Sequence, residues 1–392
     1  MTNTAIVKGI LGLLIVGIVI FSFLFFKNKR GEIAMLIISS LIALVIGEFA
    51  LRLLLPQIGT YSNMFEYDST LGWKFVPNKK GQMVLTPGAV ANMIQTNSLG
   101  FRDHAPSDNK KNKLMILGDS FVSNVSVKDD EVFTEVMENQ LKDTDVLNFG
   151  VNAYGEVQEY LLLQKWVDVI NPDLVILMVY LENDFSDVMG DYWVYSRPFA
   201  SLEGRDSILT FHPQSKVQPP QPEANATGLL AKSHINRLVN RTIKNLVEKP
   251  DTVIAAEFYT CQSPLSEDYL VRYRILEALL LKIATLAKEK NVPIVFALAP
   301  SMVQVNDEIW ESFLKKNRNT KKEFIRSLPN DKLMEFAAKN NLLMLDLLPA
   351  LLSENRKNVM LYQPREQHWT KEGNRVVADA LLDYLKSKSL IE

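Results

Sequence analysis

Residues 114–124 read LMILGDSFVSN, an apolar run that stops at Gly118 and Asp119 and is followed by Ser120. Glycine, aspartate and serine are common turn residues, so one interpretation is a buried strand followed by a turn. The other interpretation is that Ser120 is a nucleophile at the carboxyl end of that strand. A nucleophilic serine also needs a base and donors for an oxyanion, which other parts of the chain must supply.

Strands and helices alternate around this stretch. Short, largely apolar segments predict strands at 113–117 and 146–150, and longer apolar runs predict strands at 173–180, 292–300 and 341–349. Helical spacing of apolar residues predicts helices at 156–170, 269–290, 330–340 and 373–388. Strands that are apolar throughout and alternate with helices are typical of a parallel sheet covered on both faces. The sequence therefore predicts an α/β fold.

Polar residues follow three of the predicted strands. Ser120 follows the first, Gly150 ends the second, and Asn183 and Asp184 follow the third. Ligand sites in parallel sheets lie at the carboxyl ends of the strands. This coincidence favours the nucleophile over the simple turn.

His368 is the strongest candidate for the base. It lies in QPREQHWTKEGN (363–374), on a loop before the last predicted helix, which would bring it to the same sheet edge as Ser120. A partly buried structural histidine is the alternative. The other histidines are weaker candidates and lie in a turn, in a proline-rich segment and on a predicted helix: His104, His212 and His234.

Four blocks of the sequence resemble those of the SGNH (GDSL) hydrolases. Gly118-Asp119-Ser120 resembles the first block, which supplies the nucleophile, and EQHW (366–369) resembles the last, which makes His368 the base. LNFGVNAYG (147–155) and YLENDF (180–185) resemble the second and third blocks. The resemblance implies a three-layer α/β/α, flavodoxin-like SGNH-hydrolase fold with a parallel central sheet.

The resemblance also implies an oxyanion hole. Its donors would be the backbone N–H groups of Ser120 and Ala153 and the side chain of Asn183. Ala153 stands where the family has a glycine, and Leu181 stands where the family has a glycine two residues before the asparagine.

The acid of the triad is the main departure from the family. The family's carboxylate lies three residues before the histidine, where this chain has Arg365. Some membrane-anchored members carry an aspartate two residues before the histidine, and Glu366 occupies that position. The site would then be Ser120, His368 and Glu366, or a Ser–His pair without a carboxylate.

Two apolar stretches precede these blocks, at 10–26 and 33–47. With their flanks, each approaches the roughly 20 apolar residues of a membrane-spanning helix. The short loop between them, 27–32, is basic and is expected in the cytoplasm. The prediction is a two-pass anchor in the cytoplasmic membrane, with the catalytic domain facing the periplasm or the cell exterior. Glu48 and Arg52 are four residues apart and are expected to pair.

The expected organisation has three parts. Residues 1–56 form the anchor with two transmembrane helices, 57–112 a connecting segment of short strands and turns, and 113–392 the SGNH hydrolase-like domain. Periodicity lapses in an insertion at about 185–268, which is either a lid or a surface for a partner. Within it, 231–249 is expected to be helical.

Composition excludes several other functions. The net charge of the 392 residues is −2 without a long basic tract, so nucleic acid is not expected as a partner. The single cysteine, Cys261, excludes an intramolecular disulfide and a CxxC metal site. The histidines form no HExxH or HxxxH pair. No metal or cofactor is expected.

Two functions of different class remain. The first is a membrane-anchored serine esterase or O-acyltransferase that acts on ester-linked acyl groups, with acetyl foremost, of an extracytoplasmic glycan or lipid. The second is a non-catalytic SGNH-fold subunit that binds glycan or serves as a scaffold in a membrane complex. The expected partners are the acylated substrate, the bilayer and a membrane acyltransferase.

Overall fold

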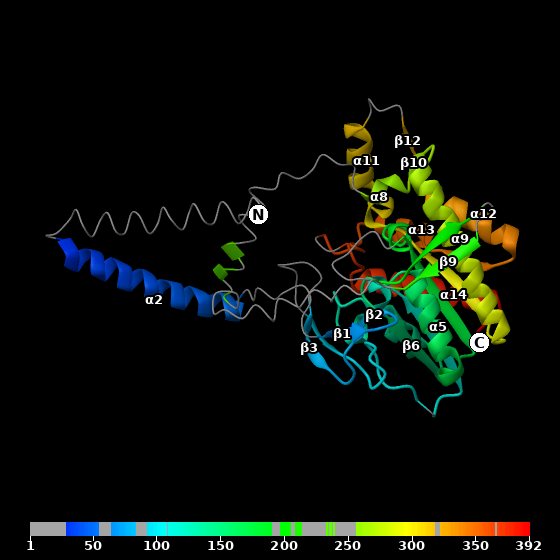
Figure 1. The fold of residues 1–392 in the computed structure, drawn as a ribbon, viewed down its shortest axis with the longest axis horizontal. Coiled ribbons are helices and arrows are strands. Elements are labelled where there is room, and N and C mark those ends of the chain that lie inside the picture. The colour runs from blue at the N-terminus through cyan, green and yellow to red at the C-terminus, as the bar shows by residue number, and fades with distance from the viewer. Residues whose placement is uncertain are drawn as a thin grey trace. The chain divides into compact units, whose positions relative to one another are not determined.

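The computed structural model of the chain is drawn in Figure 1. The structure describes residues 29–54, 64–83, 92–107, 109–189, 197–204, 208–213, 233, 235, 236, 238, 239, 256–317, 322–364 and 367–392. The chain divides into two compact units, one of residues 1–59 and 222–253, the other of residues 60–221 and 254–392.

The first unit contains helix α2 (Arg30–Leu54). Among the described residues it is the one helix long and apolar enough to cross a membrane, over Gly31–Leu51 with a mean hydropathy of 2.4. The first apolar stretch, 10–26, lies outside the described residues. The structure therefore describes one of the two expected spans, and a two-pass anchor stays a prediction.

Part of the insertion packs against α2 within this unit. The Glu48 carboxylate accepts hydrogen bonds from Ser233 Oγ (2.8 Å) and from the Ile235 N–H (3.0 Å). The side chain of Arg52, the expected partner of Glu48, lies outside the described residues. Ser233 and Ile235 therefore connect this part of the insertion to the carboxylate of Glu48 on α2.

The second unit is built on a parallel sheet of five strands in the order β13-β11-β7-β5-β6. The strands are β5 (Asn112–Gly118), β6 (Thr144–Gly150), β7 (Leu174–Tyr180), β11 (Ile294–Ala299) and β13 (Leu343–Asp346). Numbered by their order along the chain, the strands run 5-4-3-1-2 across the sheet, which is the doubly wound, flavodoxin-like order. The predicted parallel α/β sheet is confirmed. The last strand is shorter than predicted, because helix α13 already begins at Leu348.

Alternate side chains of each strand point to opposite faces, and both faces are buried. Met115 and Leu117 of β5 join a core with α5 (Glu156–Ile170) and α9 (Glu267–Glu289). Leu114 and Ile116 join a second core with α4 (Phe133–Gln140), α13 (Leu348–Asn355) and α14 (Lys371–Ser387). Helices therefore cover both faces of the sheet (Figure 1).

Shorter elements complete this unit. Antiparallel pairs form between β1 (Phe65–Asp68) and β2 (Gly72–Phe75), β3 (Lys80–Met83) and β4 (Asn92–Gln95), β8 (Phe199–Glu203) and β9 (Ile208–His212), and β10 (Gln262–Ser263) and β12 (Glu323–Phe324). The remaining helices are α3 (Ser120–Ser123), η2 (Asp129–Glu131), α6 (Asp184–Asp187), α8 (Ala256–Tyr259), α10 (Met302–Val305), α11 (Asp307–Lys316) and α12 (Leu328–Asn340).

Gly150 lets the end of β6 pack directly on helix α3. A Cβ at Gly150 would lie 2.4 Å from Ser123 N and 2.6 Å from Val122 Cβ. Because the obstacle includes backbone, we expect Gly150→Ala to lower the free energy of unfolding by about 1–3 kcal/mol. Denaturant unfolding measures this loss. Gly81→Ala is the control, since its added Cβ meets only the flexible Met64 side chain. Equal stability of the two variants would contradict this packing.

Candidate active site

Ser120 is the first residue of helix α3, directly after strand β5. Asp119 caps this helix, because its Oδ1 accepts a hydrogen bond from the Phe121 N–H at 2.8 Å. A Cβ at Gly118 would lie 2.3 Å from the Val122 side chain and 3.1 Å from Met178 Cβ, so glycine is needed there. Gly118, Asp119 and Ser120 thus form a tight turn that presents the serine at the sheet edge.

His368 lies against Ser120, although the two are 248 residues apart, with Nε2 at 2.7 Å from Ser120 Oγ. Its imidazole stacks on the Phe121 ring, with centroids 4.8 Å apart and an interplanar angle of 27°. This distance allows the serine hydroxyl to donate to Nε2, as a nucleophile donates to its base. The structure therefore brings the two central residues of the predicted triad together.

The loop that carries His368 is closed by backbone hydrogen bonds. Tyr362 and Trp369 form an antiparallel bridge, and the Gln363 N–H donates to the His368 carbonyl at 2.7 Å. The Tyr362 hydroxyl donates to the Pro300 carbonyl at 2.7 Å, just beyond strand β11. The histidine is thus tied to the same sheet edge as the serine.

Ala153 adopts a left-handed backbone conformation with φ of 61°. Non-glycine residues are uncommon there, which accounts for the glycine of the resembled family. Within the described residues, the Ala153 N–H donates to no acceptor. The neighbouring Asn152 carbonyl accepts from Trp73 Nε1 at 3.0 Å, which fixes the turn.

Asn183 precedes helix α6, and its side-chain amide faces two buried carboxylates. Nδ2 donates to Asp187 Oδ2 at 2.8 Å and to Asp119 Oδ2 at 3.4 Å. The second contact brings the amide next to the residue that precedes the serine. The amide of Asn183 is therefore close to the nucleophile, and its donors are directed to acids of the chain itself.

Arg197, at the start of the insertion, joins the loops of Asn183 and Ala153. Its guanidinium pairs with Asp187 at 2.6 Å and donates to the Ala153 carbonyl at 3.4 Å. Both side chains of the Arg197–Asp187 pair are buried, at 1% and 0% exposure. Breaking such a pair by removing one partner typically costs about 3–5 kcal/mol. At least this part of the insertion supports the candidate site directly.

Several buried carboxylic acids interact electrostatically with Asp187 of the Arg197–Asp187 pair. Burial raises the pKa of Glu156 to about 8 and that of Asp119 to about 6, and the charge of Asp187 contributes to both. Burial also raises the pKa of Glu159 and of Asp184 well above the ordinary range. Within the described part of the chain, the carboxyl oxygens of Glu159 have no hydrogen-bond partner. Burial therefore favours the protonated forms of Glu159 and Asp184.

The other predicted residues lie elsewhere or outside the described chain. Glu366 and Arg365 lie outside the described residues, so the acid of the triad stays a prediction. His234 lies outside them as well. His212 contacts Ser201 Oγ at 2.6 Å on the β8–β9 hairpin, and Cys261 is buried.

Sequence reasoning missed the residues that support the site. Asp187 and Arg197 gave no signal, because their pairing depends on how the chain folds back. Glu156 and Glu159 resemble the acids of an ordinary first helical turn, which usually face solvent. The apolar run that follows Glu159, YLLL at 160–163, was the available signal for burial.

No protein-family model and no curated protein matches the chain. Among solved structures, it is similar to a member of the lipolytic G-D-S-L family from Veillonella parvula, with 13% identity, a TM-score of 0.37, and 70% of this chain and 97% of that chain covered. It is similar to a catalytic mutant of an acetylxylan esterase from Geobacillus stearothermophilus, with 12% identity, a TM-score of 0.37, and 71% and 95% covered. An acetyl xylan esterase named AlAXEase has 15% identity, a TM-score of 0.36, and 69% and 98% covered. These structural neighbours are G-D-S-L lipolytic proteins and acetylxylan esterases, and the first group carries the name of the family that the sequence blocks resemble.

The raised pKa of Glu156, about 8, predicts a pH dependence of stability. Between the ordinary pKa of glutamate and pH 8, the folded state binds more protons than the unfolded state, so stability falls as pH rises. Glu156→Gln mimics the protonated acid. It should be more stable than the parent at pH 8, with a difference that grows by up to about 1.4 kcal/mol per pH unit across this window.

Thermal unfolding between pH 5 and pH 8 measures this effect. Glu289→Gln removes the same charge from an exposed position at the end of α9 and serves as the control. Identical pH profiles of Glu156→Gln and the parent would show that Glu156 does not hold its proton in the folded state.

Proposed function

We propose that the chain is a membrane-anchored serine esterase or O-acyltransferase that acts on ester-linked acyl groups, foremost acetyl, of a glycan or lipid outside the cytoplasm. The observation that carries the proposal is the 2.7 Å contact between Ser120 Oγ and His368 Nε2 at the carboxyl edge of a parallel sheet. A serine and a histidine in this relation form the core of an acyl-transfer site.

The reaction has two halves. Ser120 Oγ attacks the ester carbonyl carbon while its proton passes to His368 Nε2. The tetrahedral intermediate collapses, the alcohol leaves with the proton from His368, and the acyl group stays on Ser120. Water or a sugar hydroxyl then attacks the carbonyl carbon of the acyl-enzyme and gives its proton to His368. The bond between this carbon and Ser120 Oγ breaks, the proton passes from His368 back to Ser120 Oγ, and the acid or the new ester is released.

The oxyanion would be stabilised by the N–H groups of Ser120 and Ala153 and by Asn183. The shorter contact, from Asn183 Nδ2 to Asp187, holds the amide in place. The longer contact, 3.4 Å to Asp119, is the one we expect the amide to exchange for the oxyanion. Arg197 would keep the two loops at a fixed spacing through Asp187 and the Ala153 carbonyl.

Glu366 is proposed as the group that accepts a hydrogen bond from the other imidazole nitrogen of His368. A carboxylate there would fix the tautomer in which Nε2 is free to act as a base. A glutamate is longer than the aspartate of some anchored relatives, so a site without this carboxylate is the alternative.

A non-catalytic subunit that binds glycan or serves as a scaffold is the second candidate. The Asn183 amide donates to Asp119 and Asp187, and this favours the non-catalytic subunit. An oxyanion donor must instead be available to the substrate. The strain of Ala153, with φ of 61°, does not discriminate, since it serves a binding site as well as a catalytic one.

The test uses the full chain in detergent with a fluorophosphonate probe and with acetylated xylan or short-chain aryl esters. We expect the parent to be labelled and to hydrolyse esters. Ser120→Ala and His368→Ala should each abolish turnover, and the double variant should lose no more than either one, because such residues act as a unit. An unlabelled but folded parent would leave the binding subunit as the function.

The same assay separates the supporting groups. Asn183→Ala should lower turnover about 100- to 1,000-fold if it donates to the oxyanion. Glu366→Gln should be milder than His368→Ala but still large. Near-parental turnover of Glu366→Gln would leave a Ser–His pair, and turnover of Asn183→Ala within about threefold of the parent would make Asn183 a structural residue.

The proposed location also has a direct test. A two-pass anchor with the basic loop 27–32 in the cytoplasm puts both termini outside. Alkaline phosphatase fused after Glu392 should therefore be active, and a cytoplasmic reporter at the same point should not. The reverse pattern would place the domain in the cytoplasm and exclude an envelope substrate.

A further inference from the structure

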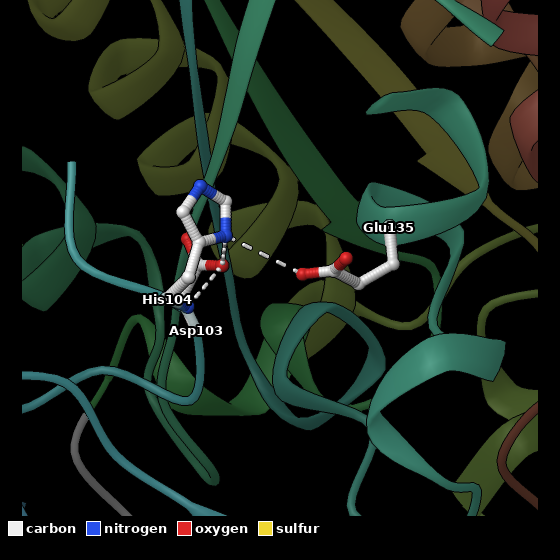
Figure 2. Close-up of side chains that lie close together, drawn as sticks. All are labelled: Asp103, His104 and Glu135. Atoms are coloured by element: carbon white, nitrogen blue, oxygen red, sulfur yellow. Dashed lines mark hydrogen bonds and ion pairs between the residues drawn. The ribbon is translucent and has the colours of Figure 1, made fainter. Parts of the chain in front are cut away.

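A second cluster of titratable side chains lies away from Ser120, around His104. The carboxylates of Asp103 and Glu135 point to the same imidazole nitrogen, as Figure 2 shows. Asp103 Oδ1 lies 2.9 Å and Glu135 Oε1 3.5 Å from Nδ1. The three groups come from the segment after strand β4 and from helix α4.

One of these distances already fits a tetrahedral metal site, and the other is shorter. Ligand atoms about 2.0–2.2 Å from a tetrahedral zinc ion lie roughly 3.3–3.6 Å apart. The Glu135 distance lies within this range, whereas the Asp103 distance of 2.9 Å lies below it. The three ligand atoms all lie within 4.8 Å of one another. Binding of an ion would therefore require Asp103 Oδ1 to move away from Nδ1 by roughly 0.4 Å.

The opposite imidazole nitrogen is held as in metal-binding histidines. Nε2 lies 2.8 Å from Oδ1 of Asp145, whose side chain is fully buried. Metal-ligating histidines typically donate their second N–H to such a carboxylate, which fixes the ring. Asp145 Oδ2 in turn accepts from the Ser107 N–H at 2.7 Å. Asp103 is also fixed, since its Oδ2 accepts from the Asn148 N–H at 2.7 Å.

The cluster contains more carboxylates than cationic side chains, and Arg102, which lines the same cavity, pairs with Asp129. Four carboxylates surround the imidazole, namely those of Asp103, Glu135, Glu138 and Asp145. Within the described chain, Lys110 pairs with Glu138 and Asp145, both on the Nε2 side. The Nδ1 side faces a cavity of about 370 Å³ that Asp103, His104 and Glu135 line. A cation and its water ligands can reach Nδ1 through this cavity.

We propose that His104 Nδ1, Asp103 and Glu135 bind one divalent transition-metal cation, Zn²⁺ foremost, with water in the remaining position. The imidazole ligand selects against Ca²⁺ and Mg²⁺, which prefer oxygen ligands. The sequence argued against a His-rich centre, and this site uses a single histidine with two carboxylates.

The ion would stabilise the fold rather than take part in ester chemistry. It would join the segment of Asp103 and His104 to helix α4. Asp103 also bonds Asn148 of strand β6, and Asn148 Nδ2 donates to the Val122 carbonyl of helix α3 at 2.8 Å. The ion would therefore also restrain strand β6 and helix α3, which lie next to Ser120.

The test is metal retention by the full chain in detergent, first stripped with a chelator and then dialysed against Zn²⁺ or Co²⁺. We expect about one ion per chain by elemental analysis, a visible Co²⁺ absorption typical of tetrahedral nitrogen and oxygen ligands, and a higher Tm. Excess Mg²⁺ or Ca²⁺ should not displace the ion.

Variants locate the ion. Glu135→Gln should weaken binding by more than the roughly 10- to 100-fold that loss of an outer partner costs, whereas Asp145→Asn should fall within that range. Asp130→Asn is the matched control, because Asp130 lines the same cavity and is exposed but does not contact His104.

No retained metal in the parent would show that only a proton occupies the cluster. Equal binding by Glu135→Gln and Asp130→Asn would place any ion elsewhere. Either result overturns the proposal.

Discussion

The five strands of the sheet are parallel, so they end at one edge, and the groups of the candidate site are attached to that edge. Both faces of a parallel sheet must be covered, which leaves the edge as the place where polar side chains can meet. Ser120 follows β5, Ala153 follows β6 and Asn183 follows β7. His368 comes from the loop before α14, and the Tyr362 hydroxyl ties this loop to the end of β11. The geometry of the site is thus a consequence of the sheet topology.

The buried polar groups close to this edge lower the stability of the fold, because charged groups are costly to remove from water. The Asp187–Arg197 pair is fully buried, and next to it lie Glu159 and Asp184, whose pKa values are raised by burial. Apolar residues of similar volume are often as stable or more stable than a buried ion pair. The Asp187–Arg197 pair holds the loops of Asn183 and Ala153 at a fixed spacing, and this role accounts for its presence. The acids can stay buried because protonation removes their charge.

The sheet and the residues near Ser120 could be predicted from sequence because they follow local rules. Long apolar runs marked the strands, and helical spacing marked α5, α9, α12 and α14. Helices α4 and α13 were not predicted, because each has only eight residues and a short amphipathic stretch is ambiguous. The Arg197–Asp187 pair and the His104 cluster depend on contacts between distant segments. No local pattern reports such contacts, and His104 was therefore rated only as a weak candidate for the base.

The contact between Ser120 and His368 also bears on biosynthesis. The two residues are 248 positions apart in the sequence. At roughly 5–20 residues per second, a ribosome needs about 12–50 seconds to add the intervening residues. During this time the serine turn can fold on strand β5, but it has no histidine beside it. A nascent chain therefore carries the serine turn without its base during this time, and the serine can meet the histidine only after the intervening residues have been synthesised.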